Sequence, residues 1–472
     1  MYKVKNVLKK MVGENEEVKI IIFGTGNYYQ KYKPYINNKD IICFADNNAM
    51  KHGTILDGKK ILNPAEIDFS ASDYIIVLIE KMNPIVEQLI SMGVEEWKIK
   101  SFLDLGELFN LDAEVYGKNG KNTFSDWCKQ YSSKKVLIVS HVLQRSGVPV
   151  ALMHMSVLLQ KMGFHVVLAS LEGGALSEEL MECNIDYIPS ISMYYRSKKF
   201  LEIVAEMDFV ILGTIVLSEV GKYISHVDVP IIWWIHESEK KYYLEHPLVD
   251  KKNIYYYAGG QRVVECFKKY YPNVRIEKLL YYLPGCECSR YRTDKIHIGM
   301  IGTIEKRKAQ DVFIRALEQI PKEKKDGVSF EIVGVLTEKY IDIEKELAEN
   351  SQLHYLGEFN QTELKRYFET LDLLVCPSRD DPMPIVVTQA MQYGVPCIIS
   401  NQVGQMEYIK NGENGYVFET ENVEELSDIL EFCIEHFEIL PYMGMQAKKI
   451  YEEYFSEKRM RDNISDILEK IM

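Results

Sequence analysis

The chain has 472 residues, of which 47% are apolar and 26% are charged, and its formal net charge is −13. This length and composition are typical of a soluble globular protein with roughly two to three domains of about 150 residues, and they exclude a disordered, collagen-like or disulfide-stapled chain. The acidic balance argues against non-specific binding to nucleic acid, which needs a basic surface. A phosphate-bearing ligand stays open, because a few local cations and backbone N–H groups suffice to bind one.

Cysteine usage and hydropathy indicate the compartment. The nine cysteines include no Cys-x-x-Cys pair, and their odd number favours a reducing compartment. Cys286 and Cys288 lie too close in sequence for an ordinary bridge. No run of about 18 apolar residues is present to span a bilayer, and the opening MYKVKNVLKK is not followed by the apolar core of a signal peptide. We therefore expect a cytoplasmic protein.

Short β-branched runs open three blocks of the chain, at 18–23, 135–140 and 296–302. Such runs are typical of central strands in a parallel sheet. Further strand candidates alternate with helical patterns at 41–44, 74–79, 166–169, 209–212, 231–235, 254–258, 330–335, 353–355, 373–376 and 397–400. This alternation predicts doubly wound α/β domains. Two such domains side by side would form a cleft suited to a nucleotide-bearing ligand.

The first block resembles a dinucleotide-binding fingerprint in part. The stretch Phe23-Gly24-Thr25-Gly26 follows a strand, and Asp46 ends the next strand at the spacing of a ribose-binding acid. The third glycine of the fingerprint is replaced by Tyr29, which would crowd a pyrophosphate. The block also resembles Rossmann-like modules fused to sugar-modifying enzymes. We favour a module for docking or regulation over a working NAD(P) site.

The second block places polar residues after two of its strands. Arg145, Ser146 and Gly147 form a loop between the strand at 135–140 and a helix predicted at 150–162; a tight turn explains this loop equally well. His236 follows the strand at 231–235, where parallel strands place ligand-binding residues. A structural histidine is the alternative. Glu237 and Glu239 are expected to cap the next helix.

The third block carries two motifs. Lys306, Arg307 and Lys308 lie between a strand and the helix predicted at 311–319. Cations beside a helix N-terminus suit a diphosphate, although a solvated surface loop is the alternative. A second loop, at 377–383, leads into a helix that Gly394 ends. Its Met383–Val386 amides could bind an anion or sugar hydroxyls, or Asp380 and Asp381 could simply cap the helix.

Residues from about 134 to 472 resemble the retaining GT-B glycosyltransferases of family GT4. The family signature is a pair of glutamates separated by seven residues, between a Pro-Ser and an Ala-Met-containing stretch. This chain has Pro377-Ser378, then Asp381, seven residues, Gln389 and the stretch AMQYGVP. Both acids of the signature are therefore altered here.

The resemblance implies roles for individual residues. Asp381 would touch the transferred sugar and Gln389 would bond to the nucleotide ribose, while His236 would contact the transferred sugar. Lys308 falls on the diphosphate-binding lysine; the arginine position is occupied by Thr303, and Arg307 could compensate. The catalytic residues expected are His236 and Asp381; the acceptor-side residues are Arg145 and Ser146; and the donor-binding residues are Gly147, Thr303, Arg307, Lys308, Met383, Pro384, Ile385 and Gln389.

The expected fold is α/β: a GT-B pair of facing Rossmann-like domains, preceded by a smaller Rossmann-like domain. The expected divisions are an accessory domain at 1–115, a linker at 116–133, an acceptor domain at 134–290, a donor domain at 291–450, and a C-terminal helix at 451–472 that crosses back to the acceptor domain. The sequence contains no Asp-x-Asp, so no metal and no cofactor are expected. In such enzymes the leaving phosphate takes the proton of the acceptor, so no enzymic base is assigned.

The leading hypothesis is a retaining, metal-independent hexosyltransferase-type enzyme of polysaccharide or glycoconjugate synthesis. It would use a UDP- or GDP-type nucleotide sugar and a glycan or lipid-linked acceptor, with no nucleic-acid partner. One alternative is a GT-B-like subunit that has lost turnover; another is an NAD-dependent sugar-modifying enzyme. Residues 1–115 are a candidate surface for a protein partner or a second copy. Basic and aromatic stretches at 194–200 and 268–271 suggest peripheral contact with the inner face of a membrane, or solvated helix faces.

Overall fold

The computed structural model describes residues 18–118, 120–286, 289–291, 293–336 and 353–472. These residues cluster into two compact units. Unit 1 contains the chain up to 115 together with 121–130 and 190–205, and unit 2 contains the rest. Each unit is described by itself below.

Unit 1 is built on a six-stranded sheet with the order β3-β4-β2-β1-β5-β6. Its central strands pair in parallel, and only β3 and β4 form an antiparallel pair. Ile21, Phe23, Ile75 and Val77 fill its core. The strands are β1 (Ile20–Phe23), β2 (Ile41–Ala45), β3 (Ile55–Leu56), β4 (Lys59–Leu62), β5 (Tyr74–Val77) and β6 (Ile99–Ser101); the helices are α2 (Asn27–Tyr32), α3 (Asn83–Ser91), α4 (Leu105–Phe109), α5 (Phe124–Lys129) and α8 (Lys198–Val204).

A nine-stranded sheet forms the first half of unit 2, and we call this half the second domain. Its order is β15-β14-β13-β12-β9-β10-β11-β7-β8, with β7 antiparallel to β11 at one edge. The strands are β7 (Glu114–Gly117), β8 (Gly120–Thr123), β9 (Lys135–Val142), β10 (His165–Glu172), β11 (Asp186–Ile188), β12 (Phe209–Leu212), β13 (Ile231–Ile235), β14 (Ile254–Ala258) and β15 (Ile276–Lys278); the helices are α6 (Gly147–Lys161), α7 (Leu176–Glu182), α9 (Ser218–Ile224), α10 (Lys240–Glu245) and α11 (Gln261–Tyr270).

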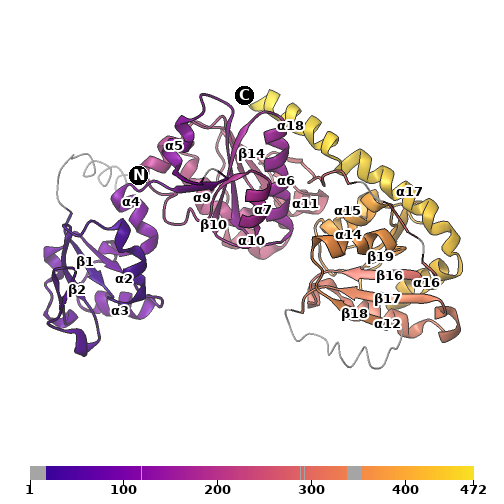
Figure 1. The fold of residues 1–472 in the computed structure, drawn as a ribbon, viewed down its shortest axis with the longest axis horizontal. Coiled ribbons are helices and arrows are strands. Elements are labelled where there is room, and N and C mark those ends of the chain that lie inside the picture. Colours follow the sequence, from indigo (N-terminus) through magenta and orange to yellow (C-terminus); the bar gives the residue numbers. More distant parts are fainter. Residues whose placement is uncertain (1–17, 119, 287–288, 292, 337–352) are drawn as a thin grey trace. The chain divides into compact units, whose positions relative to one another are not determined.

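A parallel six-stranded sheet forms the other half of unit 2, which we call the third domain (Figure 1). Its order is β18-β17-β16-β19-β20-β21. The strands are β16 (Ile296–Ile301), β17 (Val328–Val333), β18 (Leu353–Gly357), β19 (Leu373–Cys376), β20 (Cys397–Ser400) and β21 (Gly415–Phe418); the helices are α12 (Gln310–Gln319), α14 (Gln361–Thr370), α15 (Ile385–Tyr393), α16 (Val423–Glu435) and α17 (Leu440–Ile450), followed by a π-helical turn (Tyr451–Phe455) and α18 (Glu457–Ile471).

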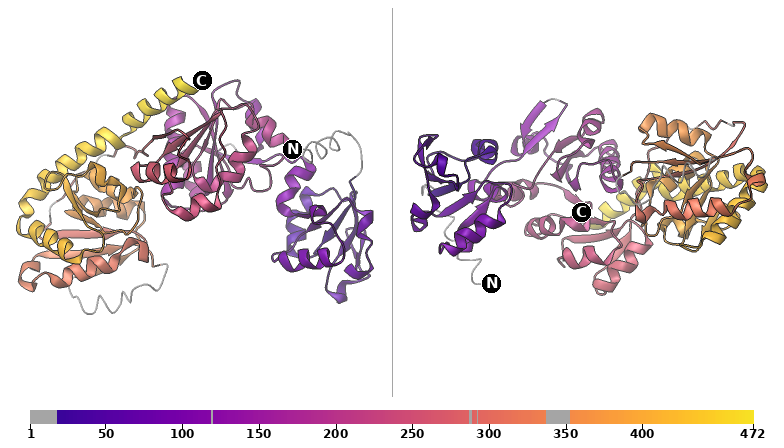
Figure 2. Two further views of the ribbon diagram at one scale, coloured as in Figure 1. Left: turned by 180° about the vertical axis from the view of Figure 1, so that it is seen from behind. Right: turned by 90° about the horizontal axis from the view of Figure 1, so that it is seen from below.

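Helices cover both faces of the third sheet. Buried side chains of α12 and α16 pack together on one face, and those of α14 and α15 pack on the other. The same arrangement is seen from behind in Figure 2. Because both faces are buried, the strands are almost wholly apolar, which is why short apolar runs predicted them. Doubly wound domains of this kind present their ligand-binding loops at the carboxyl ends of the strands.

Two stretches have structure that the sequence did not indicate. Residues 116–133, expected as a linker, contain β8 and α5. The aromatic side chains of Tyr194 and Tyr195 are buried, so the 194–200 stretch does not offer them to lipid headgroups. Cys286 is disulfide-bonded. Within the part of the chain that the structure describes, every helix is too short or too polar to cross a bilayer.

Candidate functional site

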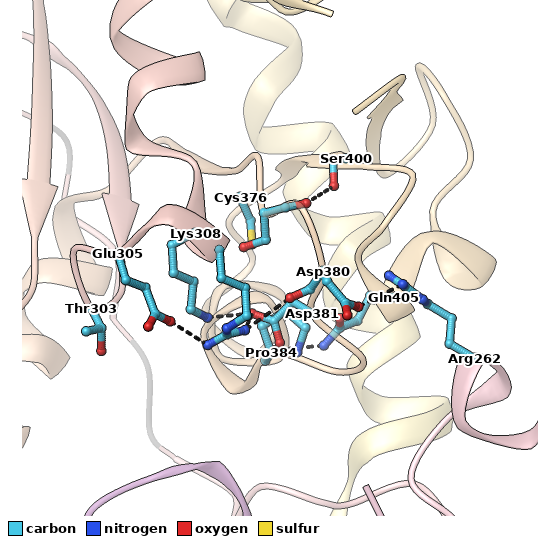
Figure 3. Close-up of polar contacts among 12 residues, drawn as sticks. Arg262, Thr303, Glu305, Lys308, Cys376, Asp380, Asp381, Pro384, Ser400 and Gln405 are labelled. Carbon is cyan, nitrogen blue, oxygen red and sulfur yellow. Dashed lines mark hydrogen bonds and ion pairs between the residues drawn. The ribbon is translucent and has the colours of Figure 1, made fainter. Parts of the chain in front are cut away.

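The candidate site lies at the carboxyl edge of the third sheet (Figure 3). Three loops meet there: 302–309 after β16, 377–384 after β19, and 401–405 after β20. Ser400 ties two of them together, because its hydroxyl donates to the carbonyl of Ser378 at 2.5 Å. The sequence motifs singled out at 302–308 and 376–400 are therefore neighbours in the fold.

Lys308 ends a short turn just before α12. Lys306–Lys308 form a 3-10 turn, and Ala309 adopts a left-handed conformation with φ of 61° before α12 starts at Gln310. The Lys308 stem packs beside Gly302, whose φ of 153° favours glycine. The ammonium group of Lys308 is directed toward Asp381 of the 377–384 loop.

Asp381 is the partner of this lysine. Its carboxylate pairs with the Lys308 ammonium, and the Arg307 guanidinium lies 3.3 Å away. Both Lys308 and Asp381 side chains are largely buried, at 15% and 10% exposure. The cations expected to hold a diphosphate are thus paired with carboxylates: Lys308 with Asp381, and Arg307 with Asp381 and with Glu305 at 2.8 Å. The alternative that Asp381 caps α15 is wrong, because Pro384 is the N-cap and no side chain bonds to the cap amides.

Asp380 faces the second domain instead. Its carboxylate accepts a hydrogen bond of 2.8 Å from Nη2 of Arg262, at the start of α11, while its carbonyl accepts one from Arg307 at 3.1 Å. Burial raises the pKa of Asp380, the charge of Arg262 opposes that rise, and the negative charge of Glu239 adds to it. Asp380 therefore does not cap α15 either.

The start of α15 is held from outside the helix. The carbonyl of Pro384 accepts hydrogen bonds from Gln405 at 2.8 Å and from the Tyr281 hydroxyl at 3.2 Å. The first-turn amides of α15, beginning at Ile385, are left facing the 377–384 loop without a side-chain cap. Gln389 lies one helical turn beyond Ile385 and therefore on the same face of the helix; it is half-buried.

His236 ends β13 in the second domain and packs against Trp234, with ring centroids 4.5 Å apart. Its Nε2 is buried without a hydrogen-bond partner among the described residues. Burial, and secondarily the charge of His141, lower the pKa of His236 to about 3. The imidazole is therefore neutral near pH 7, with a nitrogen atom free for a ligand hydroxyl.

Two further polar residues, His141 and Glu237, lie near His236. Burial lowers the pKa of His141, and its Nδ1 is also buried without a partner among the described residues. Glu237 was expected to cap a helix; instead its carboxylate accepts hydrogen bonds from the Thr214 hydroxyl and from the Ile215 amide at 3.1 Å. Glu239 is the N-cap of α10 but makes no capping hydrogen bond with its side chain. The capping expectation is wrong for both glutamates.

The remaining predicted residues lie outside these contacts. Arg145 is exposed and pairs with Glu179. Ser146 is the N-cap of α6 without a side-chain hydrogen bond, and Gly147 begins that helix with open space where a side chain would lie. The Thr303 carbonyl accepts a hydrogen bond from Gln310 at 2.9 Å, so this loop is braced from within. Met383 is described below with its neighbours in the second domain.

In unit 1, the acid expected to bind a ribose, Asp46, is bonded to other side chains of the same unit. The Asp46 carboxylate pairs with Lys51 at 2.9 Å and accepts hydrogen bonds from the amide and hydroxyl of Thr25. Tyr29 is buried, and its hydroxyl donates to Asp57 at 2.7 Å. A ribose would have to displace Lys51 and Thr25, so the geometry does not favour a dinucleotide here.

Three family models match parts of the chain. Residues 289–450 match the model of the glycosyl transferases group 1 family, residues 132–258 match glycosyl-transferase family 4, and residues 16–100 match a model described as C2185-like, N-terminal. The Anabaena protein HepE, solved in complex with UDP and glucose, is 17% identical and superposes with a TM-score of 0.60 over 71% of this chain and 99% of HepE. WaaG, a glycosyltransferase of lipopolysaccharide biosynthesis, gives a TM-score of 0.52 at 14% identity, over 71% of this chain and 99% of WaaG.

Unit 2 therefore has the GT-B fold, as the sequence predicted. Residues 289–450 form a domain of the glycosyl transferases group 1 family. Sequence relatives include a 41.2 kDa protein of the cps region of Klebsiella pneumoniae, 27% identical over 34% of this chain and 43% of the relative. Another is the glycosyltransferase MJ1607 of Methanocaldococcus jannaschii, 25% identical over 36% of this chain and 44% of the relative. The chain thus spans less than half the length of these two curated relatives.

Proposed function

We propose that the chain is a retaining glycosyltransferase that moves a sugar from a nucleotide diphosphate sugar, of UDP or GDP type, to a glycan or lipid-linked acceptor. The observation that carries this proposal is the pairing of Lys308 and Arg307 with Asp381 beside the start of α12. A diphosphate offers these cations more negative charge than the carboxylate does, and more oxygen atoms to accept hydrogen bonds.

We propose that three further groups take part in this reaction. The uncapped start of α15 would bind phosphate or sugar oxygens through its amides, and Gln389 on the same helix face would accept a hydrogen bond from a ribose hydroxyl. His236, neutral and with a free nitrogen, would bond to a hydroxyl of the transferred sugar. Together these groups would stabilise the leaving diphosphate by fixed charges and dipoles, so we propose that no divalent ion is needed.

Relatives support a role in surface glycans. The names of two sequence relatives refer to a cps region and to a spore coat, and another relative, from Campylobacter jejuni, is an N-acetylgalactosaminyltransferase acting on a diphospho-undecaprenol-linked substrate. HepE was solved with UDP-glucose as well as with UDP. We therefore propose polysaccharide or glycoconjugate synthesis at the inner face of the membrane as the setting.

A panel of nucleotide sugars read by thermal shift tests the donor, because a ligand bound only by the folded state raises its apparent stability. The donor that raises the melting temperature is then incubated with glycan and lipid-linked acceptors, with and without EDTA. Release of the nucleoside diphosphate with acceptor, unaffected by EDTA, is the expected result. If a donor binds but no acceptor leads to release of the nucleoside diphosphate, the chain is instead a GT-B-like subunit that has lost turnover. The cause would then be the differences from the family motifs at Thr303, Asp381 and Gln389.

A further inference from the structure

The 379–384 loop is fastened to its own domain at several points. Arg379 binds Glu421 and Asp311 through its guanidinium. The amide of Asp381 donates to Gln402 at 3.1 Å, and its carbonyl accepts from the Gly404 amide at 2.9 Å. These contacts fix both sides of the loop but leave the Asp380 carboxylate directed away from the third domain (Figure 3).

The second domain reaches the loop through the turn between β14 and α11. The terminal methyl group of Met383 packs against Gly260: a side chain on this glycine would lie 2.8 Å from it, so Met383 would have to shift to make room. Two residues later, Arg262 forms the 2.8 Å hydrogen bond to Asp380. The preceding glycine, Gly259, lies against the His236 ring: a side chain there would come within 2.7 Å of Nδ1. One turn of the second domain thus contacts both His236 and the 379–384 loop.

The positive charge of Arg262 offsets negative charges around Asp380 and so holds this loop near the second domain. Asp380 lies in the negative field of Glu239, from the second domain, and of Asp381; Arg262 supplies the larger opposing positive charge and Arg307 of the third domain a smaller one. Without Arg262, the second domain would present Glu239 to Asp380, and like charges would repel the loop. The Nη1 atom of Arg262 is buried without a partner among the described residues. A small movement of the loop could therefore complete a two-pronged pair with Asp380.

We propose that Arg262 is a positioning residue for sugar transfer: it holds the 379–384 loop against the turn that packs on His236, so that Asp381 keeps the geometry the reaction needs. This inference rests on the proposed function. Arg262 acts through Asp380 and touches neither Lys308 nor Asp381, so binding of a free nucleoside diphosphate depends little on it.

The test compares Arg262→Ala, Arg262→Lys, Asp380→Asn and the double variant Arg262→Ala/Asp380→Asn with a matched control, Lys278→Ala. Lys278 of the second domain pairs with Glu407 of the third domain at 2.8 Å, so the control removes an ion pair between the same two domains away from the loop. Amide hydrogen exchange of the 379–386 segment is measured without ligand, and kcat, KM and the Kd for the nucleoside diphosphate are measured where turnover occurs.

Arg262→Ala is expected to speed exchange in the 379–386 segment and to lower kcat by about ten- to a hundredfold, because small misplacements of a reactive group cost this much. The Kd of the nucleoside diphosphate should change by less than about twofold, by the same reasoning. Arg262→Lys should retain part of kcat. Adding Asp380→Asn to Arg262→Ala should slow exchange again, because it removes the charge that Glu239 repels.

Equal effects of Arg262→Ala and Lys278→Ala, or no relief of the exchange by Asp380→Asn, would overturn the proposal. If the wild-type protein releases no nucleoside diphosphate from any donor, the proposed function fails, but the exchange measurements still decide whether Arg262 positions the loop.

Discussion

Replacing Asp381 by asparagine separates the two roles that this side chain has in the proposed reaction. In the structure its carboxylate occupies the cations that a diphosphate needs, so a donor must compete with it for Lys308 and Arg307. Asparagine has nearly the same shape and keeps hydrogen-bonding atoms but has no charge. The Asp381→Asn variant should therefore bind a nucleoside diphosphate more tightly than the wild type, while transferring sugar more slowly.

The size of the effect follows from the geometry. One pair of unit charges at the 3.3 Å that separates Arg307 and Asp381 is worth about 5 kcal/mol at an effective dielectric constant of about 20. In the wild type, a bound diphosphate replaces the attraction between Arg307 and Asp381. If the phosphates restore about three quarters of that attraction, binding still costs about 1.3 kcal/mol more than in the variant, which corresponds to about tenfold in Kd. We thus expect Asp381→Asn to lower the Kd about tenfold.

Isothermal titration calorimetry with the nucleoside diphosphate, rather than with the sugar donor, measures this effect without contributions from the sugar. Asp380→Asn is the control, because it removes one negative charge from the neighbouring residue, whose side chain does not contact Lys308. The Kd of this variant for the nucleoside diphosphate should stay within about twofold of the wild-type value. A Kd for Asp381→Asn that equals or exceeds the wild-type value would refute the reasoning, as would equal tightening in the two variants.

Three further predictions concern other parts of the protein. His236→Ala should lower kcat by about a hundredfold or more and equally at pH 5.5 and pH 8, because a histidine with a pKa near 3 is neutral at both; a loss confined to one pH would contradict this. His297→Gln should lower the free energy of unfolding by about 1.5–3 kcal/mol near pH 6 and by less near pH 9, as measured by denaturant titration. The reason is that the hydrogen bond to Glu331 raises the pKa of His297. The stability that the protonated histidine contributes is lost as pH rises through that raised pKa. Gly404→Ala should lower the melting temperature, because the added methyl group would collide with the Pro382 carbonyl. Gly147→Ala should leave the melting temperature unchanged, because open space lies where its methyl group would be. Equal melting temperatures of the two variants would contradict this prediction.

Much of the fold could be predicted because its strands are buried on both faces. The bounds of β12, β13, β14, β19 and β20 are those expected from apolar runs. The strands β11, β7 and β8 at one end of the nine-stranded sheet were missed, since they are short and partly polar. Residues 190–205 were assigned to the acceptor domain, but they cluster with unit 1, and nothing in their local pattern shows this.

The candidate site was predictable where its residues belong to motifs of the sequence. Lys308 and Asp381 each lie in such a motif, and the structure brings the two residues into contact. Arg262 and Gln405 depend on the packing of loops from different strands, so no spacing reveals them; the Gly-Gly pair that precedes Arg262 was the available signal for a close approach. Asp380 and Asp381 could not be assigned separate partners from sequence, because two adjacent carboxylates look alike until the loop directs them to different domains.

The central claim is that Lys308 holds the diphosphate of a nucleotide sugar. Calorimetric titration of the wild type, Lys308→Ala and Arg145→Ala with the nucleoside diphosphate of the donor found in the panel tests it most directly. The account predicts that Lys308→Ala loses about tenfold or more in affinity, as expected for a charge-assisted contact, while Arg145→Ala, whose side chain is exposed and paired with Glu179, loses much less. Equal losses in the two variants, or wild-type affinity in Lys308→Ala, would contradict it.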